Sequence, residues 1–196
     1  MINPDSISEQ PRSCAERWKE QLDWLDAWFQ PEKAEAHDFE ATERELFDSL
    51  APAWLGAEAG AEKIAALESA SDSFGRERVL ALIGTLCADE TSAYWSELAR
   101  KEGGSLDDLV RLVWEPLLER GWEFRSEPLP NGIQLCVKRC PHAELGARLN
   151  AADWLSALVC ASDPYTAASF DPPIRFERTK TLMQGASCCD HAYFAD

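Results

Sequence analysis

Residues up to about 120 carry hydrophobic side chains at the spacing of amphipathic helices. Apolar residues recur every three or four positions, in segments separated by Pro31, Pro52 and the glycine pair 103–104. Proline and paired glycines interrupt helices, and Ser105 is suited to cap the helix that follows the pair. We therefore predict helices over residues 13–29, 39–50, 56–70, 74–95 and 105–118.

The spacing changes from residue 122 onward to an alternation of apolar and polar positions. Residues 122–126 and 133–138 alternate on either side of Asn131-Gly132, which is a strong hairpin signal. The pattern returns in residues 174–179 and in 188–194, after a turn at Gly185. Between these pairs, residues 142–161 have the pattern of a helix.

Helices followed by hairpin, helix and hairpin indicate an α+β fold. We expect a helical N-terminal part, then an antiparallel sheet built mainly from residues 122–138 and 174–194. Helices should pack on one face of that sheet, including the helix within 142–163. The one soft boundary separates a helical region, 1–104, from an α+β region, 105–196, and we expect both to form one continuous domain.

Composition narrows the classes of partner. The 196 residues include 45% hydrophobic residues and eight tryptophans, which is typical of a folded globule. The formal net charge of −16 argues against nucleic acid and anionic membranes as partners, whereas a small molecule remains compatible. The N-terminus has no signal-peptide pattern, so we expect a cytoplasmic protein with reduced thiols. Homo-oligomerisation is left open.

The candidate chemistry lies in the C-terminal third. Five of the seven cysteines and two of the three histidines follow residue 135. Three cysteines have a neighbour that can move a proton or hold a charge: Cys140 with His142, Cys160 with Asp163, and Cys189 with Asp190 and His191. Because such neighbours control how much thiolate exists, these seven residues are the candidate catalytic or binding residues.

Local geometry sharpens these candidates. In an extended strand Cys189 and His191 share one face, and Cys188 and Asp190 share the other. Cys140 lies at a strand-to-helix junction, where helix amides should lower the pKa of its thiol. Cys160 and Asp163, three residues apart at the end of the predicted helix, should share one helix face.

Two basic residues could hold a substrate carboxylate. Arg178 and Lys180 share one face of a predicted strand, and arginine binds carboxylates in a bidentate manner. For every candidate a structural role is the alternative, such as a buried thiol, a surface histidine or a solvated strand face. We interpret the remaining cysteines as structural or incidental and the helical tryptophans as core: Cys14, Cys87, Cys136 and Cys188, and Trp18, Trp24, Trp28 and Trp114.

A metal site is a further alternative. Cys140, Cys160 and Cys189, with a carboxylate or His191 as fourth ligand, would supply suitable donors. The short Cys-x-x-Cys spacing typical of metal sites is missing from the sequence. We therefore predict no cofactor and keep the metal as an open alternative.

The C-terminal motifs resemble those of the L-2-amino-thiazoline-4-carboxylic acid hydrolase family. The resemblance rests on Cys140-Pro141-x-Ala143-Glu144, Cys160-x-x-Asp163 and Arg178-Thr179-x-Thr181-Leu182-x-x-Gly185-x-x-x-Cys189-Asp190-x-x-Tyr193, within residues 136–194. The ending is also similar to the 4-vinyl-reductase-type small-ligand-binding domain, which has helices packed on a twisted antiparallel sheet.

The resemblance implies a hydrolase that opens a small sulfur- and nitrogen-containing ring of the 2-aminothiazoline carboxylate type. A thiolate of Cys189 or Cys140, or an activated water, would attack the C=N carbon. His191, His142 or Asp163 would transfer protons, and Arg178 would anchor a carboxylate. The alternatives are a non-catalytic small-ligand sensor or carrier, and a metal- or redox-responsive thiol protein.

Overall fold

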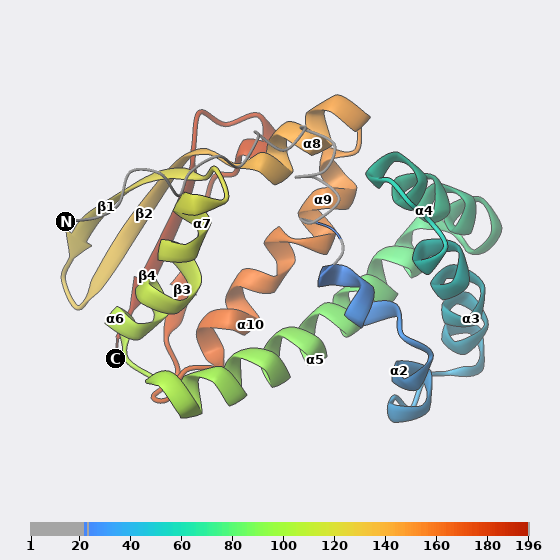
Figure 1. The fold of residues 1–196 in the computed structure, drawn as a ribbon, viewed down its shortest axis with the longest axis horizontal. Helices are drawn as coiled ribbons and strands as arrows, with labels where there is room; N and C mark the ends of the chain where they lie inside the picture. Colours follow the sequence, from blue (N-terminus) through green and yellow to red (C-terminus); the bar gives the residue numbers. More distant parts are fainter. Residues whose placement is uncertain (1–21, 23, 196) are drawn as a thin grey trace, which may run out of the picture.

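A helical half precedes the sheet in the computed structural model, which describes Leu22 and residues 24–195 (Figure 1). Most of the first predicted helix, including Trp18, lies outside these residues. The first elements are η2 (Trp24–Phe29), α2 (Pro31–Ala36), α3 (Ala41–Leu55), α4 (Gly60–Phe74) and α5 (Arg76–Glu102). Among the described residues, no helix is both long and apolar enough to cross a membrane.

Two prolines act differently from each other. Pro31 lies in the first turn of α2, where its missing N–H costs no hydrogen bond. Pro52 was expected to end a helix, but it lies inside α3, which continues to Leu55. The burial of Leu50 and Trp54 on either side explains why the helix tolerates the proline, because their packing offsets one lost backbone bond.

The next segment is a rod that lies against the sheet. It consists of α6 (Leu106–Leu109), the π-helical turn η3 (Val110–Trp114) and α7 (Glu115–Glu119). The Ser105 side chain accepts a hydrogen bond from the Asp108 N–H and caps α6, as predicted. Gly103, with φ of 126°, ends α5 before this rod.

The sheet confirms the predicted α+β class. Its strands are β1 (Glu123–Leu129), β2 (Gly132–Arg139), β3 (Arg175–Glu177) and β4 (Cys189–Phe194). They are arranged in the order β1-β2-β4-β3, and every neighbouring pair is antiparallel. Asn131, with φ of 55°, makes the tight turn between β1 and β2.

The single helix expected over 142–161 is several shorter ones. They are α8 (Pro141–Leu149), α9 (Ala152–Leu158), the 3-10 turn η4 (Cys160–Ser162) and α10 (Asp163–Ala168). Asn150 ends α8 because it adopts a left-handed conformation, with φ of 50°. The last short turn, η5 (Leu182–Gln184), precedes β4.

Two hydrophobic clusters form the core. One gathers the N-terminal helices and includes Leu145, Trp154 and Leu158 from α8 and α9. The other covers one face of the sheet with residues of η3, α10 and the end of α5. The 142–163 segment therefore packs mainly on the helical half, and it is the following helix, α10, that contacts the sheet, at β3. Figure 1 shows α9 and α10 between α5 and the sheet.

Candidate active site

Strand β4 carries the most specific part of the motif. Cys189 and His191 lie on its inner face and are each only 6% exposed, whereas Asp190 is more exposed and lies opposite Cys136 on the outer face. This division confirms the predicted alternation along the strand. It places a thiol and an imidazole side by side in the core of the sheet.

His191 is paired with a carboxylate from another element. Its Nε2 lies 3.4 Å from Oδ2 of Asp163, the first residue of α10. The prediction that Asp163 ends a helix is wrong, because Pro164 occupies the first turn of α10 instead of stopping a preceding helix. His191 Nδ1 is buried and has no hydrogen-bond partner among the described residues.

Arg178 links this pair to the surrounding backbone. Its Nη1 donates to Asp163 Oδ2, and its Nη2 donates to the carbonyl oxygen of Cys160 at 3.0 Å. The expected strand face shared by Arg178 and Lys180 is wrong, because β3 ends at Glu177. Beyond that point the guanidinium turns inward to the carboxylate, while Lys180 is exposed.

Burial and neighbouring charges raise the thiol pKa values of the three candidate cysteines. Burial is the main reason that the thiol pKa of Cys140 rises to about 11. Burial also raises the pKa values of Cys160 and Cys189, and nearby Asp163 adds to both increases. Ionised Cys189 would raise the pKa of Cys140, and ionised Cys140 and Cys189 would each raise that of Cys160.

Two opposing effects act on the thiol pKa of Cys140, and the sequence-based prediction considered only the weaker one. Cys140 is the N-cap residue of α8, and the backbone amides of Ala143 and His142 do lower its thiol pKa. Burial acts more strongly in the opposite direction, because a thiolate is poorly solvated there. The predicted lowering of this pKa is therefore wrong.

Cys189 receives a hydrogen bond from the loop before its strand. The backbone N–H of Leu182 donates to Cys189 Sγ at 3.2 Å. Thr181 caps η5 by accepting from the Gln184 N–H, and Gly185 turns the chain with φ of 82°. The motif residues Thr181, Leu182 and Gly185 thus shape the loop that covers Cys189.

Asp190 binds the backbone just before this loop, at residues 179 and 180, from the outer face of the sheet. Its carboxylate accepts hydrogen bonds from Thr179 N at 2.9 Å, Lys180 N at 2.6 Å and Thr179 Oγ1 at 2.5 Å. Although partial burial opposes them, these bonds lower the pKa of Asp190. Its contacts are those of a residue that orients the backbone next to Arg178.

The second candidate histidine has a different environment. His142 lies in α8, is 5% exposed, and packs edge-to-face on Trp122 with ring centroids 5.0 Å apart. His191 instead meets Trp114, whose ring centroid lies 4.8 Å away. The sequence pattern predicted a core position for Trp114 but not its contact with His191. Trp114 ends the π-helical turn at 110–114, which the pattern did not indicate.

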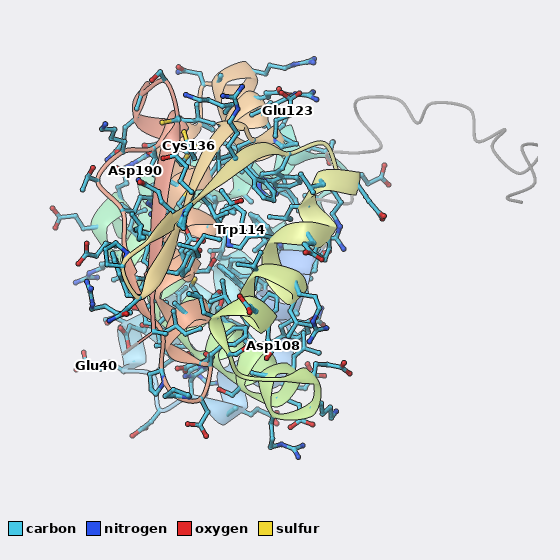
Figure 2. The ribbon with its side chains drawn as sticks, turned by 90° about the vertical axis from the view of Figure 1, so that its left-hand side faces the viewer. Glu40, Asp108, Trp114, Glu123, Cys136 and Asp190 are labelled. Atoms are coloured by element: carbon cyan, nitrogen blue, oxygen red, sulfur yellow. The ribbon has the colours of Figure 1, made fainter. Side chains whose placement is uncertain are left out.

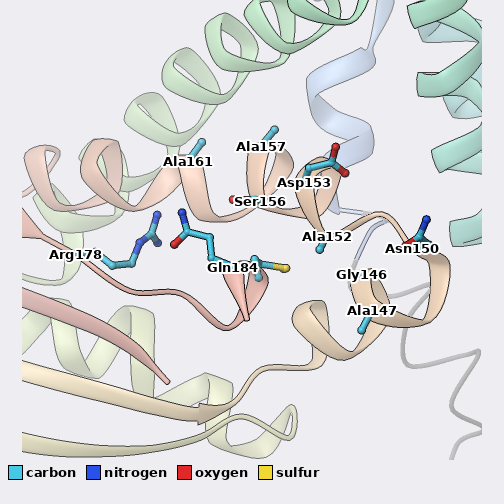
Figure 3. A pocket seen from close by; sticks show the side chains of 11 residues that line it. Gly146, Ala147, Asn150, Ala152, Asp153, Ser156, Ala157, Ala161, Arg178 and Gln184 are labelled. Carbon is cyan, nitrogen blue, oxygen red and sulfur yellow. The ribbon is translucent and has the colours of Figure 1, made fainter. Parts of the chain in front are cut away.

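A cavity of about 800 Å³ opens beside the ion pair, between α8, α9 and η5 (Figure 3). Arg178 lines it and thereby connects it to Asp163. Sequence reasoning missed its other polar lining residues, and only Gln184 of these lies within the motif that runs from Arg178 to Tyr193. They are Asn150, Asp153, Ser156 and Gln184.

The same residues were the candidates for a metal site. Within Leu22 and residues 24–195, no three or more His, Cys, Asp or Glu side chains are grouped to hold a metal ion. Cys140, Cys160 and Cys189 therefore do not make up such a group.

Comparisons with known proteins agree with the C-terminal motifs and extend them toward the N-terminus. Residues 56–193 match the family model described as L-2-amino-thiazoline-4-carboxylic acid hydrolase. No curated protein and no solved structure matches the chain. The matched range begins before α4 and thus includes helices to which no sequence motif pointed.

Proposed function

Because the chain belongs to the L-2-amino-thiazoline-4-carboxylic acid hydrolase family, we propose that it hydrolyses a small ring of the 2-aminothiazoline carboxylate type. Water adds to the C=N carbon between the ring nitrogen and sulfur. The carbon–sulfur bond then breaks, the sulfur leaves with a proton as a thiol, and an N-carbamoyl product remains.

The observation that carries this proposal is the orientation of His191. Its Nε2 faces Asp163, and its buried Nδ1 has no hydrogen-bond partner among the described residues. A carboxylate on one ring nitrogen orients an imidazole and leaves the other nitrogen to exchange a proton with the reactants. We assign His191 the role of general base toward water and then of acid toward the sulfur.

Water is the better nucleophile in this proposal. Burial raises the thiol pKa values of Cys140, Cys160 and Cys189, so each thiol is mostly protonated at neutral pH in the protein without substrate. A protonated thiol is a weak nucleophile. We therefore assign these three cysteines no nucleophilic role, with attack by the Cys189 or Cys140 thiolate as the alternative.

Arg178 is the proposed anchor for the substrate carboxylate. Its guanidinium uses N–H groups on Nη1 and Nη2 for Asp163 and the Cys160 carbonyl. A guanidinium carries five N–H donors, so others remain for an anion in the adjoining cavity. The pair with Asp163 also fixes the position of the guanidinium before the substrate arrives.

Turnover by the purified protein tests the proposal. We expect conversion of 2-aminothiazoline-4-carboxylate to an N-carbamoyl product, followed by mass spectrometry. His191→Gln should lower kcat by about 10²–10⁴-fold, because it removes the proton-transfer group. His37→Gln is the matched control, since it removes another histidine–carboxylate contact, 3.1 Å from Asp89, away from the site. Equal activity of both variants would refute the role of His191.

A non-catalytic ligand carrier is the second candidate. The observation that favours it is a cavity of about 800 Å³ lined by Arg178, Asn150 and Gln184, because binding an anionic ligand needs only such a pocket. Calorimetry separates the two functions. Stoichiometric binding of the same compound without product formation would support the carrier and contradict the hydrolase.

A further inference from the structure

A pair of cysteines lies on the face of the sheet opposite to the candidate active site. Cys136 of β2 is directly across from Asp190 of β4. Cys188 is two residues before Asp190, and residues two apart in extended chain point to the same side. Cys188 is therefore diagonal to Cys136. Figure 2 shows Cys136 beside Asp190 on this face.

The Cys188 thiol also perturbs the thiol of Cys136. A hydrogen bond with Cys188 is the main reason that the pKa of Cys136 is raised, and burial adds a smaller effect. Both residues are partly exposed and neither is in a disulfide. Their setting differs from that of Cys140 and Cys160, whose pKa values are raised mainly by burial.

We propose that Cys136 and Cys188 form a reversible disulfide and are a thiol-oxidation site separate from the active site. With a hydroperoxide as oxidant, one thiol sulfur is oxidised to a sulfenic acid and the peroxide is reduced, with loss of an alcohol or water. The second thiol then attacks that sulfur, a sulfur–sulfur bond forms, and water leaves. A dithiol reductant reverses the change and is itself oxidised.

The local backbone permits this bond. Diagonal residues on antiparallel strands are roughly 7–8 Å apart, whereas disulfides usually need Cα atoms within about 6.8 Å. Cys188 lies in the bend before β4, and the ladder to β2 starts with Cys189 opposite Val137. The small remaining approach can therefore occur at Cys188 without breaking a strand–strand hydrogen bond.

Such a bond would act on the loop that covers Cys189. Cys188 follows the segment 182–187, in which Met183 and Gln184 line the cavity and the Leu182 N–H donates to Cys189. Joining Cys188 to β2 would restrict the end of this segment. The inference does not depend on the proposed reaction, because it concerns the covalent state of two thiols on the outer face.

Peptide mapping of the whole oxidised protein tests the inference. The reduced chain is treated with a small excess of hydrogen peroxide, its free thiols are alkylated, and it is digested with trypsin without reduction. The sequence predicts a cross-link between tryptic peptides 126–138 and 181–196. The link should disappear when a dithiol reductant is added before alkylation.

Two adjacent substitutions identify the cysteine, because peptide 181–196 contains both Cys188 and Cys189. Cys188→Ser should abolish the cross-link to 126–138, and Cys189→Ser, the matched control, should leave it. A link that survives Cys188→Ser, a link between two copies of the chain on a non-reducing gel, or irreversible oxidation of Cys188 without any link would each overturn the inference.

Discussion

Replacing Asp163 by Asn removes the charge on which His191 and Arg178 converge. The side chains of His191, Arg178 and Asp163 are 7%, 16% and 24% exposed, respectively. Asparagine keeps nearly the same volume, so the change isolates the charge. It leaves the Arg178 guanidinium largely buried without its carboxylate partner.

The expected loss of stability follows from this partial burial. Exposed ion pairs contribute about 0–1 kcal/mol, and removing one partner of a fully buried pair costs about 3–5 kcal/mol. The pair between Arg178 and Asp163 lies between these limits, so we expect Asp163→Asn to lower the free energy of unfolding by about 2 kcal/mol. In urea this corresponds to a decrease of about 1 M in the unfolding midpoint.

Tryptophan fluorescence during urea unfolding measures the change, and turnover is measured on the same samples. Glu177→Gln is the matched control, because it removes the carboxylate partner of Arg175 in an exposed pair and should cost less than about 1 kcal/mol. We also expect Asp163→Asn to lower kcat, since His191 loses its orienting carboxylate. An Asp163→Asn protein as stable and as active as the Glu177→Gln protein would refute the reasoning.

Three further outcomes can be checked. Burial raises the thiol pKa values of Cys87 and Cys140 from 9.0 to about 11, so their contribution to stability is complete below pH 9 and is lost between pH 9 and 11. The loss should reach roughly 2–3 kcal/mol per thiol in urea unfolding, and equal stability at pH 8 and 11 would contradict it. In the presence of reductant, Cys188→Ser should leave turnover unchanged, whereas Cys189→Ser should lower it by distorting the loop bonded to its sulfur; equal losses would contradict the two-face assignment. Asp190→Asn should lower the free energy of unfolding by about 1–2 kcal/mol near pH 7 and by much less near pH 3. A carboxyl whose pKa is lowered by folding stabilises the folded protein at pH values above its unfolded-state pKa, and that stability is lost as the pH falls. Thermal unfolding at the two pH values measures this difference, and a pH-independent cost would count against it.

Local sequence determined the features that depend on neighbouring residues. Asn131-Gly132 specified the hairpin, Ser105 the helix cap, and alternation along 188–194 the faces of Cys189 and His191. Each rests on backbone preferences or on the two-residue repeat of a strand, which short segments express by themselves. The order of the C-terminal motifs likewise sufficed to indicate the family.

Only the tertiary structure decided which groups meet. His191 could have paired with its neighbour Asp190, but strand geometry turns that carboxylate to the other face, and Asp163 approaches from α10. Arg178 leaves its strand for the same carboxylate. The raised thiol pKa of Cys140 was also beyond local reasoning, because the desolvation that outweighs the helix amides is the sum of all surrounding atoms, most of them distant in the sequence.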